Sequence, residues 1–152
     1  MRIYLPMTVA DLADPDGARP SAAHAVTSEL AAALPGEDEE GLEFAALLAA
    51  ADASVGLLSV DPSVPRRRVV VVADVSGVAA ARAGGLPSEV VPPAVVPWDR
   101  VVSLHVDDGD AESDVAAAAA GDEEALERAA ERDLLWFDIS ELDDLRGLSG
   151  QS

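Results

Sequence analysis

The sequence predicts an α+β domain: a βαββαβ ferredoxin-like or related mixed sheet of four to five strands packed by helices. Two observations support this class. Short apolar runs have the periodicity of strands, and longer Ala-rich segments have the spacing of amphipathic helices. Along the chain they follow the order strand, helices, strand, extended segment, strand, helix, strand. In the ferredoxin-like version, the strands at 68–75 and 134–139 would lie at the two edges of the sheet.

Four segments read as strands: residues 2–5, 68–75, 101–107 and 134–139. The second contains an unbroken valine run, which predicts a strand covered on both faces. Val70 and Val72 are therefore expected to be fully buried, as is Leu135 or Phe137. The third strand alternates, so three of its residues are expected to face the core: Val102, Leu104 and Val106.

The helical segments are residues 8–12, a helix capped by Thr27 or Ser28, and residues 38–54, 76–83, 113–133 and 140–145. The apolar stripe of 38–54 is wide enough to predict contact on more than one side. A break is expected at Gly121-Asp122. Because Pro92-Pro93 cannot donate to a ladder, 89–96 is expected to be an edge strand or an extended loop.

The chain length of 152 residues fits one ordinary domain, expected at 1–146, with a frayed tail at 147–152. Aromatic residues make up only 3% of the chain, so the core must consist mainly of Ala, Val and Leu. The few bulky side chains are then expected to matter individually as packing anchors. They include Tyr4, Phe44, Trp98, Trp136 and Phe137.

The formal net charge is −19, and all ten basic residues are arginine. Such a negative field repels phosphate backbones, so neither nucleic-acid binding nor adhesion to anionic membranes is expected. With no cysteine, disulfides and thiolate chemistry are unavailable. No signal peptide and no membrane-spanning segment are expected, which favours a cytoplasmic protein.

Three stretches carry a family resemblance: Met1–Pro6, Pro97–Asp108 and Leu134–Asp138. Together with the acidic helix at 37–52, they resemble a family of small acidic actinobacterial proteins with no assigned function. The resemblance spans nearly the whole chain. It implies a bacterial cytoplasmic origin and carries over no catalytic residues.

His105 and Asp107 are the strongest candidates for chemistry, because their spacing allows both side chains to leave one face of one strand. A histidine beside a carboxylate acts as a general base or contributes to a hard metal site. Only His24 offers a second imidazole. The more ordinary interpretation is a solvated or interfacial histidine on the polar side of a strand.

In the acidic loop at 107–114, four carboxylates alternate like the first ligands of a calcium loop, but the pattern then fails: Asp108, Asp110, Glu112 and Asp114. Ser113 stands where the turn needs glycine, and Ala119 stands where a bidentate glutamate is needed. A solvated loop is therefore favoured. No metal site and no cofactor are expected.

Arg66, Arg67 and Arg68 form the one basic cluster of the sequence. They are candidates for gripping a phosphate or a partner's carboxylates. Self-neutralisation or protection of a strand end is favoured instead, since adjacent residues of a strand alternate faces and cannot all converge. Trp98 is a weaker ligand-binding candidate, because tryptophans more often act as packing anchors.

No dinucleotide, P-loop, nucleophile-elbow or zincin motif is present in the sequence. We therefore favour a non-enzymatic cytoplasmic module that binds a protein partner or self-associates in a regulatory role. The alternative is a small enzyme or ligand-binding domain centred on His105 and Asp107. Convergence of those side chains in a concave pocket favours the alternative, whereas an exposed apolar patch favours the module.

Overall fold

The computed structural model describes residues 1–79 and 85–150. Its sheet has six strands in the order β4-β2-β1-β3-β5-β6, and every neighbouring pair is antiparallel. The strands are β1 (Arg2–Met7), β2 (Ala23–Ala25), β3 (Val69–Asp74), β4 (Glu89–Val90), β5 (Val101–Val106) and β6 (Leu135–Asp138). The α-helices of the described residues are α1 (Ser28–Ala33), α2 (Glu39–Val60), α3 (Glu112–Ala119), α4 (Glu123–Ala130) and α5 (Leu142–Arg146).

The α+β class is confirmed, but the ferredoxin-like arrangement is wrong. β3 lies inside the sheet, where β1 and β5 flank it, instead of at an edge. β1, β3, β5 and β6 follow one another across the sheet in chain order, all antiparallel. The valine run explains this position, because a strand that is apolar on both faces gains most where both faces are covered.

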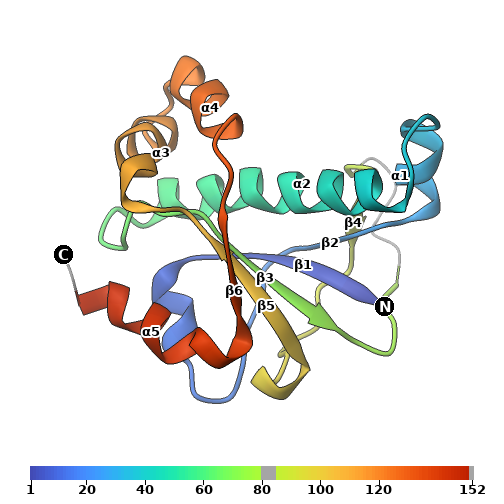
Figure 1. Ribbon diagram of the computed structural model, residues 1–152, viewed down its shortest axis with the longest axis horizontal. Helices are drawn as coiled ribbons and strands as arrows, with labels where there is room; N and C mark the ends of the chain where they lie inside the picture. Colours follow the sequence, from blue (N-terminus) through green and yellow to red (C-terminus); the bar gives the residue numbers. More distant parts are fainter. Residues whose placement is uncertain (80–84, 151–152) are drawn as a thin grey trace.

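Both faces of β3 are covered as expected. Val70 and Val72 pack with Tyr4 beneath α2, which lies across one face of the sheet (Figure 1). Val69 and Val71 belong to the larger core on the other face, which also takes in the 3-10 helix η1 (Val9–Ala13) and α5. The expected burial of Leu135 or Phe137 is wrong, since Leu135 is exposed and Phe137 is only partly buried.

Helix α2 begins after Asp38, whose side chain accepts a 2.9 Å hydrogen bond from the Gly41 amide, and it runs to Val60 instead of ending at 54. It packs on the sheet and also on α3, so contact on more than one side is confirmed. By length and composition alone α2 could cross a membrane, contrary to the sequence-based expectation. In this structure, 39% of that apolar window is buried inside the domain.

The alternation expected for residues 101–107 is interrupted by a β-bulge. Val72 pairs with Ser103, but Ala73 pairs with Val101, so one extra residue lies between them. Val101 therefore joins Leu104 in the larger core, while the partly buried Val102 packs on the α2 side. The expectation that Val102 shares a core with Leu104 is wrong for this reason.

Several smaller expectations have mixed outcomes. The helical segment at 113–133 is broken as expected, and Gly121 adopts a φ of 104° between α3 and α4. β2 had no sequence signal, and residues 92–93 lie outside the strands. Of the helix expected at 76–83, residues 76–79 are irregular and 80–83 lie outside the described residues. Within the expected tail, Gly147–Gly150 forms a 3-10 turn (η5).

Candidate functional site

His105 and Asp107 do not form a joint site. The Asp107 carboxylate is buried and faces Arg68: Oδ2 accepts from the Arg68 backbone amide and from Nε, and Oδ1 accepts from Nη2, each at 2.8 Å. All of this bonding ties the start of β3 to the end of β5. His105 instead projects from β5 toward α2, where burial lowers the pKa of its imidazole.

The three adjacent arginines make separate contacts, as the alternation of a strand predicts. Arg66 donates to the Leu58 carbonyl in the last turn of α2 and to the Val64 carbonyl in the loop after it. Arg67 donates to the Glu112 carboxylate at 2.9 Å. Arg68 belongs to Asp107. The structure therefore gives each of them a partner within the chain.

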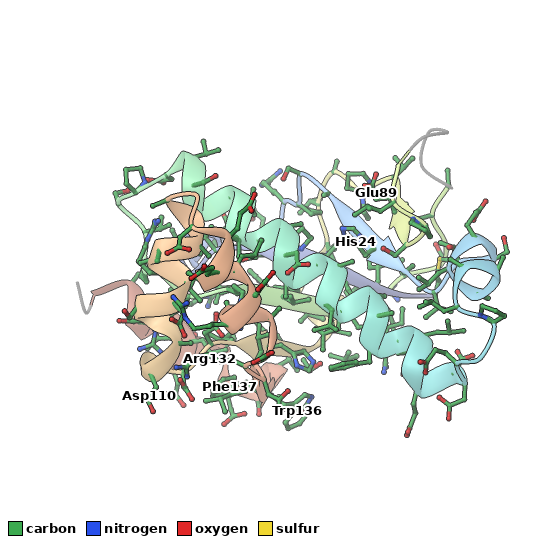
Figure 2. The ribbon with its side chains drawn as sticks, turned by 90° about the horizontal axis from the view of Figure 1, so that it is seen from above. His24, Glu89, Asp110, Arg132, Trp136 and Phe137 are labelled. Atoms are coloured by element: carbon green, nitrogen blue, oxygen red, sulfur yellow. The ribbon has the colours of Figure 1, made fainter. Side chains whose placement is uncertain are left out.

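His24 lies on β2, and two strands separate it from the strand of His105. Its ring is buried, and Nδ1 lies 2.7 Å from the Ser88 hydroxyl. Burial lowers the pKa of His24, while nearby Glu89 opposes that shift. Figure 2 shows His24 and Glu89 on one side of the molecule and Trp136 on the other. The two imidazoles do not meet.

Trp98 packs against the larger core, on the face of the sheet opposite α2. Its indole Nε1 donates to the Asp14 carbonyl at 2.7 Å, and the Arg146 guanidinium lies 5.6 Å from the ring centroid. In the acidic loop, Asp108 caps a 3-10 turn, η3 (Gly109–Ala111), and Asp114 binds two arginines, Arg128 and Arg132. No group of three or more metal-ligating side chains occurs among the described residues.

The side chain of His105 lines a recess between α2 and the β5–β6 side of the sheet. Two adjoining cavities of about 280 and 270 Å³ share four lining residues. These four define what we term the aromatic recess: Phe44, Leu47, His105 and Trp136. Tyr4 and Ser103 line the first cavity, and Leu134 lines the second.

Acidic side chains outnumber basic ones around the aromatic recess. Glu40 and Glu43 line its first cavity and Asp133 lines its second. Burial, and after it the Glu43 charge, raise the pKa of Tyr4 to about 12. The Tyr4 phenol therefore stays neutral and senses a negative local field.

Strand β6 forms an open edge of the sheet beside the aromatic recess. Among the residues that the structure describes, it pairs with β5 alone, with Trp136 opposite His105 and Phe137 opposite Leu104. Trp136 is 61% exposed, Leu135 is 45% exposed, and Phe44 on α2 is 51% exposed. Figure 2 shows Trp136 and Phe137 at the margin of the molecule. The expectation that Phe44 and Trp136 anchor the core is therefore wrong.

The backbone of β6 presents hydrogen-bonding groups outward at Trp136. The Asp138 amide donates to the Glu141 carboxylate at 2.9 Å, so it does not donate to β5. In a strand, the backbone groups of every second residue point to the same side. The amide and carbonyl of Trp136 therefore point away from β5, as the Asp138 amide does. Glu141 thus blocks one end of the edge and leaves the part around Trp136 open.

The edge position that the ferredoxin-like version predicts for residues 134–139 is confirmed for β6, but the interpretation of Trp136 as a packing residue misses its exposure. The run Leu134–Phe137 offered a usable signal, since it is fully apolar and belongs to the last strand of the chain. In a sheet whose strands follow chain order, the last strand lies at an edge and has one free side. The missing information was which side chains of this edge strand remain uncovered.

The fold and the site define an antiparallel α+β domain with an open, apolar edge strand next to an acidic-rimmed recess. The chain belongs to a family of unknown function, DUF6912, which matches residues 1–145. This agrees with the resemblance to an uncharacterised family. No curated protein and no solved structure matches the chain.

Proposed function

We propose that this protein is a non-enzymatic interaction module that binds an extended segment of a partner protein along β6. The observation that carries the proposal is the position of Trp136, which is 61% exposed on an open edge strand and lines the aromatic recess. Tryptophan is enriched among the residues that dominate protein interfaces. Addition of a partner strand to a free sheet edge is a common mode of peptide recognition.

The energetic argument concerns uncovered apolar surface. A tryptophan buries about 150–250 Å² when it is covered, so an exposure of 61% leaves roughly 100 Å² in water. At ~25 cal/mol per Å², covering that surface is worth about 2–3 kcal/mol. Phe44 and Leu135 add to the same patch. A partner that covers all three side chains recovers this free energy.

The backbone argument concerns edge protection. Natural sheets block their free edges with short strands, charges or covering segments. At the other end of this sheet, β4 has only two residues. On β6, the Glu141 carboxylate blocks Asp138 but not Trp136. An apolar edge left open at its centre supports a role in strand pairing.

The alternative is a small-ligand site centred on His105. The first cavity favours it, because Tyr4 and Ser103, which both carry a hydroxyl group, line the same space as His105. However, Asp107 and the cluster at 66–68 are bound elsewhere, so His105 lacks the polar partners that the enzyme hypothesis required. We therefore prefer the interaction module. A bacterial cytoplasm, suggested by the family resemblance, is the setting that we propose for it.

The proposal is tested by affinity capture from native cell extract with three variants of the full chain. Trp136→Ser removes the aromatic side chain, and Trp136→Pro also removes the outward amide, which an edge strand tolerates. Val60→Ser is the control: Val60 is 83% exposed and lies roughly 24 Å along α2 from Phe44, at 1.5 Å per residue.

We expect a protein that is captured by the wild type and by Val60→Ser but lost with Trp136→Ser, and lost more completely with Trp136→Pro. Circular dichroism checks that each variant is folded. Equal capture by all variants would refute the role of β6. Sedimentation of the wild type at micromolar concentration is the second measurement. A dimer that Trp136→Ser converts to a monomer would show that β6 binds a second copy of this chain instead of a different protein.

A further inference from the structure

We infer that the partner segment is a strand that alternates basic and apolar residues, with its arginine or lysine side chains on the α2 face of β6 and its apolar side chains on the opposite face. The inference rests on the proposed function, since it specifies the chemistry of the segment that β6 receives. Three features of the described residues carry it: unpaired carboxylates, exposed aromatic rings, and the apolar character of the far face.

The carboxylates at the aromatic recess are free to pair. Glu40, Glu43 and Asp133 form no ion pair among the described residues. Of the two arginines that line the cavities, Arg2 pairs with Asp74, and Arg132 shares Asp114 with Arg128, so the three unpaired carboxylates outnumber the one positive charge left over. The net charge available to a bound segment at this place is therefore negative.

The aromatic rings favour the same chemistry. Arginine and lysine side chains lay their aliphatic stems on apolar surface and place the cation in water or on an aromatic face. Trp136 and Phe44 provide exposed rings beside the carboxylates. The chain itself contains such a contact, since the Arg146 guanidinium lies 5.6 Å from the ring centroid of Trp98. A cationic side chain over Trp136 can reach Glu43 or Asp133 as well.

The opposite face of β6 calls for apolar partner residues. Trp136 shares its face with His105, so Leu135 and Phe137 project to the other side, where they lie opposite Val106 and Leu104 of the larger core. Leu135 is 45% exposed there. Because successive side chains of an added strand also alternate, the partner has to alternate basic and apolar residues to satisfy both faces.

Charge also argues against a second copy as the occupant. Each chain carries a net charge of −19, so two copies repel one another before they meet. A basic segment is instead attracted over about one Debye length, which is about 8 Å at physiological salt. The carboxylates at the recess then orient it beside β6.

The test uses fluorescein-labelled, capped nine-residue peptides and the full-length protein, with fluorescence anisotropy as the measurement. One peptide alternates arginine and valine, a second alternates glutamate and valine, and a third has the arginines and valines of the first in two blocks. We expect the first to bind at least tenfold more tightly than the other two. Binding is expected to weaken with added sodium chloride.

Matched variants separate a local site from general attraction by the net charge. Glu40→Gln/Glu43→Gln removes two carboxylates at the recess, and Glu123→Gln/Glu124→Gln removes two exposed carboxylates from α4. We expect at least fivefold weaker binding in the first and less than twofold change in the second. Equal losses in both would overturn the inference, because only the net charge would then matter.

The two proposals fail in different ways. If Trp136→Ser and Trp136→Pro abolish partner capture from extract but the arginine–valine peptide binds no better than its block version, the alternating basic chemistry is wrong and the β6 site stands. If the arginine–valine peptide binds and Trp136→Ser leaves its affinity unchanged, it does not occupy β6 and the inference is wrong. A dimer centred on Trp136 would also overturn it.

Discussion

Arg68 and Asp107 form a bidentate ion pair inside the domain, with 1% and 0% of their side chains exposed. The same carboxylate accepts the backbone amide of Arg68, and Arg68 Nη2 lies 3.3 Å from the Arg132 carbonyl. The pair joins the residue just before β3 to the residue just after β5. A carboxylate that satisfies three donors in the interior is a structural group, so its loss is expected to affect folding directly.

We predict that Asp107→Asn strongly destabilises the protein. It keeps the shape of the side chain but leaves the buried Arg68 charge without a counter-charge, which costs about 3–5 kcal/mol. The double variant Arg68→Met/Asp107→Leu removes both charges and is expected to recover most of that loss. Urea unfolding followed by circular dichroism measures the free energy of unfolding. A single-variant loss below about 1 kcal/mol would mean that the pair is hydrated in solution.

We predict an abnormal titration of Tyr4, the one tyrosine in the chain. Burial and the Glu43 charge raise its pKa to about 12, whereas an unfolded tyrosine ionises near 10. The folded state thus favours the neutral phenol, so this stabilisation is complete below about pH 10 and is lost as the pH rises toward 12. Absorbance at the tyrosinate band reports the midpoint directly.

Glu43→Gln provides the control for this titration. It removes the second cause of the shift while leaving Tyr4 buried, so the midpoint should fall part of the way toward 10. A wild-type midpoint near 10 would contradict the burial of the phenol. An unchanged midpoint in Glu43→Gln would contradict the negative field that we ascribe to the recess.

We predict that His24 makes the protein less stable in mild acid. Its folded pKa is lowered by burial, so the folded state binds fewer protons than the unfolded state below about pH 6.5. The stability contributed by neutral His24 is present above that pH and is lost as the pH falls through the lowered value. His105 shifts in the same direction, so single variants are needed.

The measurement is the free energy of unfolding between pH 5 and 7 in wild type, His24→Gln and His105→Gln. We expect the dependence on pH to flatten in His24→Gln. Protonation of carboxylates also relieves self-repulsion, but that effect is common to all three proteins and cancels in the comparison. Parallel curves for wild type and His24→Gln would show that the ring is hydrated in the folded state.

We predict that added salt raises the melting temperature. Self-repulsion at a net charge of −19 is screened over about 8 Å at physiological ionic strength, so the folded state gains as sodium chloride increases to a few tenths molar. Thermal melts at low and moderate salt measure the effect. A flat or falling melting temperature would mean that the ion pairs of the surface outweigh the net repulsion.

The sequence by itself determined those features that depend on local pattern. The valine run at β3 predicted a strand with two covered faces, because every side chain in it is apolar whichever way it points. The helices at α2, α3 and α4 and the break at Gly121 follow from capping residues, periodicity and glycine. The inability of the three adjacent arginines to converge follows from the alternation of extended chain.

Tertiary structure alone decided which strands are neighbours, and the candidate site depends on that. β2 has three residues and no distinctive composition, so its hydrogen bonds to β1 and β4 hold it in the sheet. The bulge at Val72/Ala73 changes which of Val101 and Val102 enters the larger core. Arg68 takes Asp107 away from His105, β3 lies inside the sheet instead of at an edge, and Trp136 on β6 is uncovered. These outcomes depend on contacts between residues far apart in the chain, whose free energies no local periodicity records.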